Sequence, residues 1–189
     1  MGSLAGNFVE LFSSVQGEGP HVGASTLFVR LGVCDLRCRW CDSPHTWQAA
    51  DTCRIQVSRG SSAFREIANP VPVAAIVAAA EALDLASHAF VALTGGEPLL
   101  QPEVVRALAQ ALRDRGPRIH LETHGLAHEA LAHVVDVVDL VAMKGWTFPP
   151  DGSGKPSETA IPDDLAAASQ SARDALIEYQ LDPERVIVR

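Results

Sequence analysis

The chain has 189 residues, of which 47% are hydrophobic and 20% charged, as expected of a globular protein rather than a disordered one. Its formal net charge of −8 disfavours a broad basic surface of the kind that binds nucleic acid. No apolar run is long enough to cross a membrane, and residues 1–7 lack the pattern of a secretory signal. We therefore expect a single domain over residues 1–189 in the cytoplasm, with no nucleic-acid or membrane partner.

Apolar and β-branched runs predict strands at residues 8–12 and 26–33. Residues 46–70 are irregular and polar, so we expect a loop insertion there, with a short helix near residues 64–68. Pro72 opens an alanine-rich stretch that predicts a helix over residues 73–85.

The remaining chain alternates between the two kinds of element. Strands are predicted at residues 89–93, 118–123, 137–143 and 185–188, helices at 102–115, 128–133 and 163–179, and a loop at 146–162. This alternation predicts an α/β fold, a partial (β/α) barrel with parallel strands. The sequence stops inside the last expected strand, so we expect either a C-terminal truncation that removes the final strand–helix segment or a variant that completes its site differently, for example by dimerising.

Three cysteines, Cys34, Cys38 and Cys41, follow the second predicted strand with the spacing C-x3-C-x2-C. A [4Fe–4S] cluster can be held by three thiolates, which leaves one iron open to a small molecule. A structural zinc site is the alternative, and it needs a fourth ligand, for which His45 or Cys53 is available. We otherwise interpret Cys53 as a free thiol in a loop.

Chemically informative residues follow four of the predicted strands. These are Cys34, the segment 94–98 (TGGEP), Glu122 and Lys144. Ligand sites in parallel α/β folds lie at the C-terminal ends of the strands, so these residues predict one shared site. The two glycines remove side chains and are expected to leave backbone amides and carbonyls open to a carboxylate or an amino group of a ligand.

The three-cysteine loop together with residues 94–98 resembles the radical S-adenosylmethionine superfamily. This resemblance implies a [4Fe–4S] cluster on Cys34, Cys38 and Cys41. It implies S-adenosylmethionine at the open iron, cleaved to a 5′-deoxyadenosyl radical that abstracts hydrogen from the substrate.

A narrower resemblance rests on residues 10–12 (ELF), 15–19 (VQGEG), 28–31 (FVRL), 41–43 (CDS) and 121–125 (LETHG). In this order they resemble the 7-carboxy-7-deazaguanine synthase family. Its members are lyases that convert 6-carboxy-tetrahydropterin to 7-carboxy-7-deazaguanine and ammonia by a radical ring contraction, on the route to queuosine.

The resemblance also implies roles for individual residues. Arg30 is implied to pair with the substrate carboxylate, Glu122 to contact the cofactor ribose, and Ser43, where the family usually has threonine, to ligate Mg2+. The implied substrate contacts are Val15, Gln16, Gly17, Arg30 and Thr94. The implied cofactor contacts are Trp40, Cys41, Asp42, Gly96, Glu122, Ala142, Met143 and Lys144. No side chain is implied as a catalytic base.

By the same resemblance we expect a flavodoxin or ferredoxin as reductant, and we also expect a homodimer. Two other functions remain open. One is a radical enzyme that generates a glycyl radical on a partner protein, and the other is a non-catalytic zinc-binding module. Gln16 and Arg30 favour a small substrate, because a protein substrate needs no carboxylate clamp.

Overall fold

The computed structural model of the chain describes residues 3–38, 41–143 and 186–188. Its strands are β1 (Ala5–Gly6), β2 (Phe8–Val15), β3 (Ser25–Leu31), β4 (Thr52–Gln56), β5 (Phe64–Ala68), β6 (Val71–Pro72), β7 (Phe90–Gly95), β8 (Arg118–Thr123), β9 (Leu140–Met143) and β10 (Val186–Val188). Its α-helices are α1 (Val73–Ala82), α2 (Pro102–Arg113) and α3 (His128–Val134). Short 3-10 turns occupy Gly19–His21, Pro44–Thr46, Leu85–Ser87, Pro98–Leu100 and Val135–Val137.

One sheet of eight strands organises the fold, in the order β10-β9-β8-β7-β3-β2-β4-β5. From β3 to β10 neighbouring strands are parallel, which confirms the predicted partial barrel for this part. Strand β2 is antiparallel to β3, because residues 16–24 join them directly and a parallel pair would need a long crossover. The sheet is therefore mixed rather than fully parallel.

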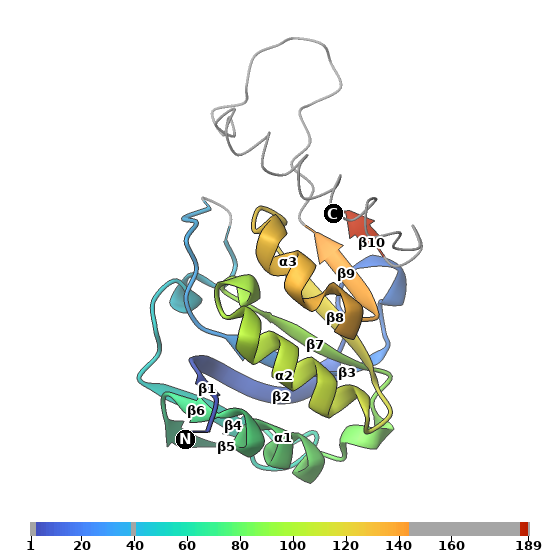
Figure 1. The fold of residues 1–189 in the computed structure, drawn as a ribbon. Helices are drawn as coiled ribbons and strands as arrows, with labels where there is room; N and C mark the ends of the chain where they lie inside the picture. Colours follow the sequence, from blue (N-terminus) through green and yellow to red (C-terminus); the bar gives the residue numbers. More distant parts are fainter. Residues whose placement is uncertain (1–2, 39–40, 144–185, 189) are drawn as a thin grey trace, which may run out of the picture.

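Helices α1, α2 and α3 cover one face of this sheet (Figure 1). Because strand side chains alternate between the faces, Val91, Leu93, Ile119 and Leu121 point toward the helices and join the buried core. Helix α2 begins with a proline at its first turn and contributes Val104, Val105, Leu108, Ala109 and Leu112 to the same core. The opposite face of the sheet is left to carry Arg30, Thr94 and Glu122.

The structure of residues 46–70 differs from the predicted loop insertion. They contain β4 and β5, which pair antiparallel and extend the sheet beyond β2, so the predicted helix near residues 64–68 is wrong. Strand β4 shows partial alternation, with Cys53 and Ile55 buried and Arg54 exposed. Polar residues on the exposed face of this edge hairpin made the segment look irregular in sequence.

The start of one predicted strand also differs from expectation. Residues 135–137 form a 3-10 turn, so the strand predicted over residues 137–143 begins only at Leu140. The loop predicted over 146–162 and the helix predicted over 163–179 lie outside the described residues. Within those residues, no helix is both long and apolar enough to span a membrane.

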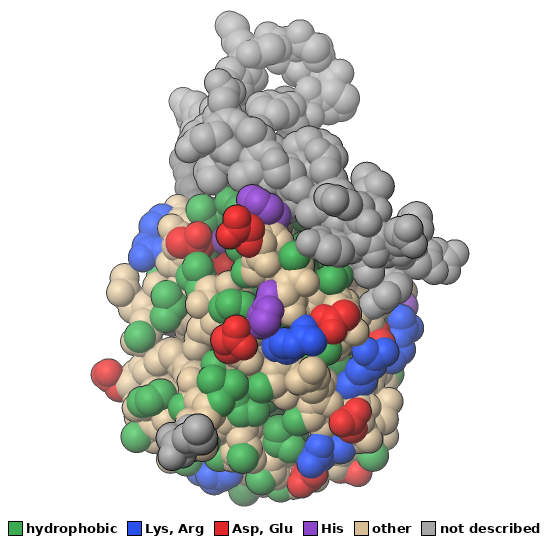
Figure 2. Space-filling view, viewed as in Figure 1, with side chains coloured by type: hydrophobic (Ala, Val, Ile, Leu, Met, Phe, Trp, Pro, Cys, Tyr) green, Lys and Arg blue, Asp and Glu red, His purple; other side chains and the backbone are tan. Residues whose placement is uncertain are grey.

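Charged side chains of both signs stand next to one another on the helix-covered face (Figure 2). Arg106 of α2 makes a bidentate pair with Asp136, with nitrogen–oxygen distances of 2.6 and 2.8 Å. Arg113 lies 3.4 Å from Asp139. Exposed pairs of this kind contribute little to stability, so the helices are held on the sheet mainly by their apolar faces.

Candidate active site

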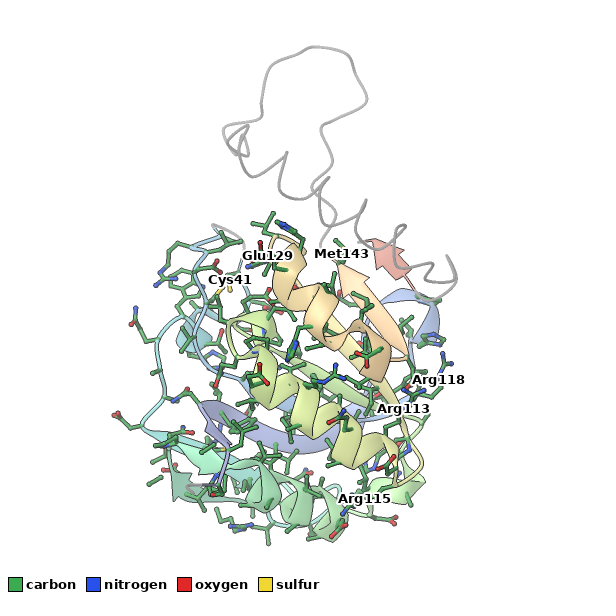
Figure 3. All side chains as sticks on the ribbon, in the orientation of Figure 1. Cys41, Arg113, Arg115, Arg118, Glu129 and Met143 are labelled. Carbon is green, nitrogen blue, oxygen red and sulfur yellow. The ribbon has the colours of Figure 1, made fainter. Side chains whose placement is uncertain are left out.

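A cavity of about 320 Å³ opens at the C-terminal ends of the parallel strands. Cys41 and Met143, which both line it, lie at this end of the molecule in Figure 3, whereas Arg115 lies toward the opposite end. Of the residues predicted to form the site, these line the cavity: Gln16, Gly17, Arg30, Cys34, Cys38, Cys41, Asp42, Ser43, Thr94, Gly96, Glu122, Ala142 and Met143.

Three predicted residues are not placed in the cavity. Val15 lies at the end of β2 with 57% of its surface exposed and does not line it. Trp40 and Lys144 lie outside the described residues. Gly95, from the predicted segment 94–98, also lines the cavity, and so do residues that were not predicted, namely Glu18, Phe28, Leu36, Thr46, Trp47, Thr123 and His124. The period-two alternation along β3 was a usable signal for Phe28, which shares a face with Arg30.

The cysteine loop is held at both of its ends by backbone hydrogen bonds. Cys34 N donates to Trp47 O at 3.3 Å, and Cys41 N donates to Cys38 O at 3.1 Å. The guanidinium of Arg37 donates to the carbonyl of Cys34 at 2.7 Å and lies 5.2 Å from the centre of the Trp47 ring. Backbone hydrogen bonds therefore help to shape the two ends of the loop that carries the thiols.

The three thiols fit an iron–sulfur cluster by their chemistry. None of them is in a disulfide and all line one cavity, although the described side chains include no preassembled group of three His, Cys, Asp or Glu that could hold a metal. Burial raises the pKa of Cys34, partly offset by a backbone hydrogen bond from Leu36. A thiolate at this position is thus favoured by a bound metal rather than by the protein alone.

The chain turns sharply between β3 and the cysteine loop. Val33 has a φ of 75°, a left-handed conformation that strains a β-branched residue. Its carbonyl accepts from Glu97 N at 2.8 Å, and Leu31 O accepts from Gly96 N at 2.9 Å. The amides of Gly96 and Glu97 are therefore used to hold the turn, which corrects the expectation that this segment leaves its amides open to a ligand.

Both glycines are required by close packing. A Cβ on Gly95 would lie 2.1 Å from Leu31 O, and one on Gly96 would lie 2.1 Å from Val33 O. Gly95 also has a φ of 125°, which side chains rarely adopt. The end of β7 is thus fitted directly against the start of the cysteine loop.

Glu97 is a charged residue that is 0% exposed. It connects the end of β7 to the end of β8. Its carboxylate accepts from Leu99 N at 2.8 Å, from Thr123 Oγ1 at 2.9 Å and from His124 N at 2.8 Å. Burial raises the pKa of Glu97, and the neighbouring His124 and the hydrogen bonds oppose this shift. The sequence motif singled out this residue, but its role as a buried bridge depends on contacts with residues far along the chain.

His124, whose role the sequence left open, connects this bridge to the cysteine loop. Its Nδ1 accepts from Leu126 N at 3.1 Å, and its Nε2 lies 3.0 Å from Asp35 Oδ1. Nδ1 also lies 3.3 Å from Glu97 Oε2, which is an ion pair only if the ring is protonated. His124 thus connects Glu97 to Asp35 of the cysteine loop.

A polar network spans the cavity wall between β2, β7 and β8. Gln16 Nε2 donates to Glu122 Oε1 at 3.0 Å, and Thr94 Oγ1 donates to Glu122 Oε2 at 2.8 Å. Gln16 Oε1 accepts from Gly17 N at 2.9 Å and so fixes the turn after β2. The buried His120 lies next to this network, with its Nδ1 3.3 Å from Gln16 Nε2. Three predicted residues, Gln16, Thr94 and Glu122, are thus brought together.

Arg30 and Ser43 meet on another part of the cavity wall. Arg30 Nε donates to Glu10 Oε1 at 2.9 Å, and its Nη1 reaches Ser43 Oγ at 3.5 Å. Ser43 Oγ in turn donates to Asp42 Oδ1 at 2.8 Å. The cationic guanidinium of Arg30 and the hydroxyl oxygen of Ser43 therefore both face the cavity.

The proposed fourth zinc ligands are not at this site. Cys53 is fully buried in β4 as part of the core, so its expected position in a loop is wrong, while its description as a free thiol is confirmed. His45 is exposed on a 3-10 turn and does not line the cavity. The geometry therefore gives no support to a four-ligand zinc site built on either residue.

The fold and the cysteine-lined cavity define a class of protein. The sequence profile of the Radical SAM superfamily matches residues 29–150, and the chain belongs to this superfamily. Membership implies a [4Fe–4S] cluster and S-adenosylmethionine, with which the three free cysteines are compatible.

Curated relatives add a more specific similarity. The chain is 37% identical over 137 residues to a 7-carboxy-7-deazaguanine synthase of Geobacter sulfurreducens, covering 71% of this chain and 54% of that protein. It is 35% identical over 141 residues to the 7-carboxy-7-deazaguanine synthase of Thermococcus kodakarensis, covering 71% and 56%. The chain thus spans about half the length of these relatives.

A solved structure with the same fold is that of QueE from Escherichia coli, with a TM-score of 0.54 and 18% identity. The similarity covers 97% of this chain and 81% of that one. At this level of identity it supports the fold, a mixed α/β sheet with helices on one face, and no individual residue role.

Proposed function

We propose that the protein is a carbon–nitrogen lyase that forms 7-carboxy-7-deazaguanine and ammonia from 6-carboxy-tetrahydropterin. The observation that carries this proposal is the position of Arg30, whose guanidinium lines the same cavity as Cys34, Cys38 and Cys41. A partly buried arginine fork is well suited to a carboxylate, and the proposed substrate carries one. The named relatives, at 35–37% identity, support the same substrate.

The chain's own residues would bind and orient the substrate. Arg30 holds the carboxylate, while Gln16, Gly17 and Thr94 contact the pterin ring through the network that Glu122 organises. Val15 contributes only its backbone in this arrangement, because its side chain is exposed. The wall of the cavity positions the reacting carbon and excludes water.

Residues on the other wall would hold the cofactors. Cys34, Cys38 and Cys41 ligate the cluster, and Gly96, Asp42, Ala142 and Met143 contact S-adenosylmethionine, together with Trp40 and Lys144. Glu122 faces the ribose. When bound, the cluster and S-adenosylmethionine supply the one-electron chemistry that starts the ring contraction.

Mg2+, the reductant and the assembly are further parts of the proposal. Ser43 Oγ is a hard oxygen donor suited to Mg2+. The Arg30 guanidinium 3.5 Å away would repel a second cation unless the substrate carboxylate lay between them. We therefore place Mg2+ beside the bound carboxylate. A flavodoxin or ferredoxin supplies the electron, and the protein acts as a homodimer.

The test is anaerobic reconstitution with iron and sulfide, followed by turnover with S-adenosylmethionine, dithionite, Mg2+ and 6-carboxy-tetrahydropterin. The expected products are 7-carboxy-7-deazaguanine and ammonia, detected by mass spectrometry. Cleavage of S-adenosylmethionine without any deazaguanine would leave the superfamily chemistry intact and remove the proposed substrate. Zinc without iron or sulfide in anaerobically purified protein would contradict both.

A further inference from the structure

A row of three charged side chains crosses three neighbouring strands. The register of β2 and β3 sets Glu10 opposite Arg30, and the register of β2 and β4 sets Arg54 opposite Glu10. We call these residues, Arg30, Glu10 and Arg54, the charge row. It begins at the cavity and ends on the hairpin of β4 and β5.

Each oxygen of Glu10 is directed to a different arginine. Oε1 accepts from Arg30 Nε at 2.9 Å, and Oε2 lies 3.9 Å from Arg54 Nη1. The side chains of Arg30 and Glu10 are 20% and 17% exposed, so their contact is largely shielded from water. Arg54 is further fixed by its position over the Phe64 ring, 4.4 Å from its centre.

The contact with Glu10 determines which nitrogens of the Arg30 guanidinium are available to a ligand in the cavity. Because Glu10 takes the Nε–H, the Nη nitrogens remain for the cavity, where Nη1 already reaches toward Ser43. Recognition of a carboxylate by a guanidinium depends on the orientation of its planar fork. Glu10 itself does not line the cavity, so it acts only through Arg30.

The charges in the row also decide its attraction for an anion. Arg30 and Glu10 together are formally neutral, whereas the three residues carry one net positive charge. Arg54, with 52% of its side chain exposed, is partly screened by solvent and is expected to give the weaker effect.

We propose that Glu10 is a positioning residue that fixes the guanidinium of Arg30 for the carboxylate end of a small substrate, and that Arg54 keeps the row positive. The proposal rests on the proposed function, because that function supplies the carboxylated substrate. It gives the β4–β5 hairpin a role in selecting the ligand.

The test compares two ligands that differ only in the carboxylate, pterin-6-carboxylic acid and pterin. Binding of each to the reconstituted protein with S-adenosylmethionine is measured by ligand fluorescence, and the ratio of the two Kd values reports carboxylate recognition. The wild type is expected to prefer the carboxylated ligand by about tenfold or more. Glu10→Ala is expected to abolish most of this preference while the Kd for pterin stays unchanged.

Three further variants separate orientation from fold and charge. Glu10→Gln keeps an oxygen that accepts from Arg30 Nε, so its ratio is expected to stay within about threefold of the wild type. Arg54→Ala is expected to lower the ratio by about threefold at low salt and not at high salt. Arg65→Ala, an exposed arginine of the same hairpin opposite Ile55, is the matched control and should leave the ratio unchanged.

Several outcomes would overturn the inference. Equal weakening of both ligands by Glu10→Ala would mean a structural role, and a higher ratio in that variant would mean that Glu10 is only a counter-charge. A wild type without preference for the carboxylated ligand would remove carboxylate recognition altogether. If the preference and its dependence on Glu10 are present but no deazaguanine forms on turnover, the proposed function fails alone and the inference stands.

Discussion

A Cβ atom on Gly96 would lie 2.1 Å from the carbonyl oxygen of Val33, the residue immediately before the first cysteine of the loop. Val33 itself is held in a left-handed conformation with a φ of 75°. The two residues therefore fix the path of the chain from β3 into the cysteine loop. Neither the strained turn nor the packed glycine can be relaxed without moving the other.

Gly96→Ala should displace this turn. The added methyl meets backbone rather than a flexible side chain, so we expect a loss of about 2 kcal/mol or more in the free energy of unfolding. Iron and sulfide retained after anaerobic reconstitution should fall in parallel. Gly17→Ala is the control, because a Cβ there has nothing within 4 Å. Equal iron content in both variants would contradict the packing argument.

Glu97→Ala should destabilise the fold more than its size suggests. It removes the acceptor of Leu99 N, Thr123 Oγ1 and His124 N and leaves these donors buried, so we expect a loss of about 3 kcal/mol or more in urea unfolding. Glu129, on the first turn of α3, is exposed, and its alanine variant should cost about 0.5 kcal/mol. A similar small loss for Glu97→Ala would show that the bridge contributes little.

Cys53 gives a prediction for alkaline pH. Burial raises the pKa of this thiol to about 12 from an ordinary value of 9.0, with Glu10 adding to the effect. The folded chain therefore keeps a proton that the unfolded chain releases, so the free energy of unfolding is insensitive to this group below pH 9 and falls as the pH rises toward 12.

The measurement is urea unfolding of the wild type and Cys53→Ala from pH 7 to pH 11. The variant should be less stable at neutral pH because of the cavity it creates, by about 1–2 kcal/mol. The difference in the free energy of unfolding should narrow above pH 9, because only the wild type has this thiol and loses stability through it as the pH rises. A gap that is constant with pH would contradict the raised pKa.

Arg30→Ala tests the carboxylate clamp in turnover. Loss of a bidentate charged contact predicts a rise of about 30-fold or more in KM for 6-carboxy-tetrahydropterin. Uncoupled cleavage of S-adenosylmethionine should survive, because Arg30 is assigned to the substrate. Arg65→Ala, at an exposed residue of β5, serves as the control. An unchanged KM in Arg30→Ala would make Arg30 an ordinary strand residue.

Ser43 tests the place of Mg2+. With Ser43→Ala the hydroxyl that contacts Asp42 and Arg30 is lost, and we expect activity to become insensitive to Mg2+ and to its removal by a chelator. Ser43→Thr keeps the oxygen and should respond to Mg2+ within about threefold of the wild type. Persistent stimulation by Mg2+ in Ser43→Ala would place the ion elsewhere.

The sequence predicted the parts of the site that lie on strand ends and motifs. Cys34, Thr94 and Glu122 each follow or end a parallel strand, and the C-terminal ends of such strands meet at one edge of the sheet. The sequence did not reveal why Glu97 is there, because its partners on β8 and after it, Thr123 and His124, are far away in the chain. Buried bridges of this kind depend on tertiary contacts that no local pattern encodes.

The sequence also failed to predict the strands at one edge of the sheet. Residues 52–56 form β4, which lies between β2 and the edge strand β5, and they carry Thr52 and Arg54 on their exposed side, so their alternation was masked and a loop was predicted instead. The antiparallel setting of β2 was also missed, although the short connection at residues 16–24 favours a hairpin. Without β4 in place, the pairing of Glu10 with Arg54 was invisible.

Strand β3 carries Arg30 and continues directly into Cys34. Four residue steps of extended chain span at most about 13 Å, and the turn at Val33 makes the distance shorter. The backbone between these residues therefore limits how far a carboxylate held by Arg30 can lie from the thiol of Cys34. If Arg30 holds the substrate carboxylate as proposed, the short path of chain from Arg30 to Cys34 limits the length of a substrate that can lie between the two side chains.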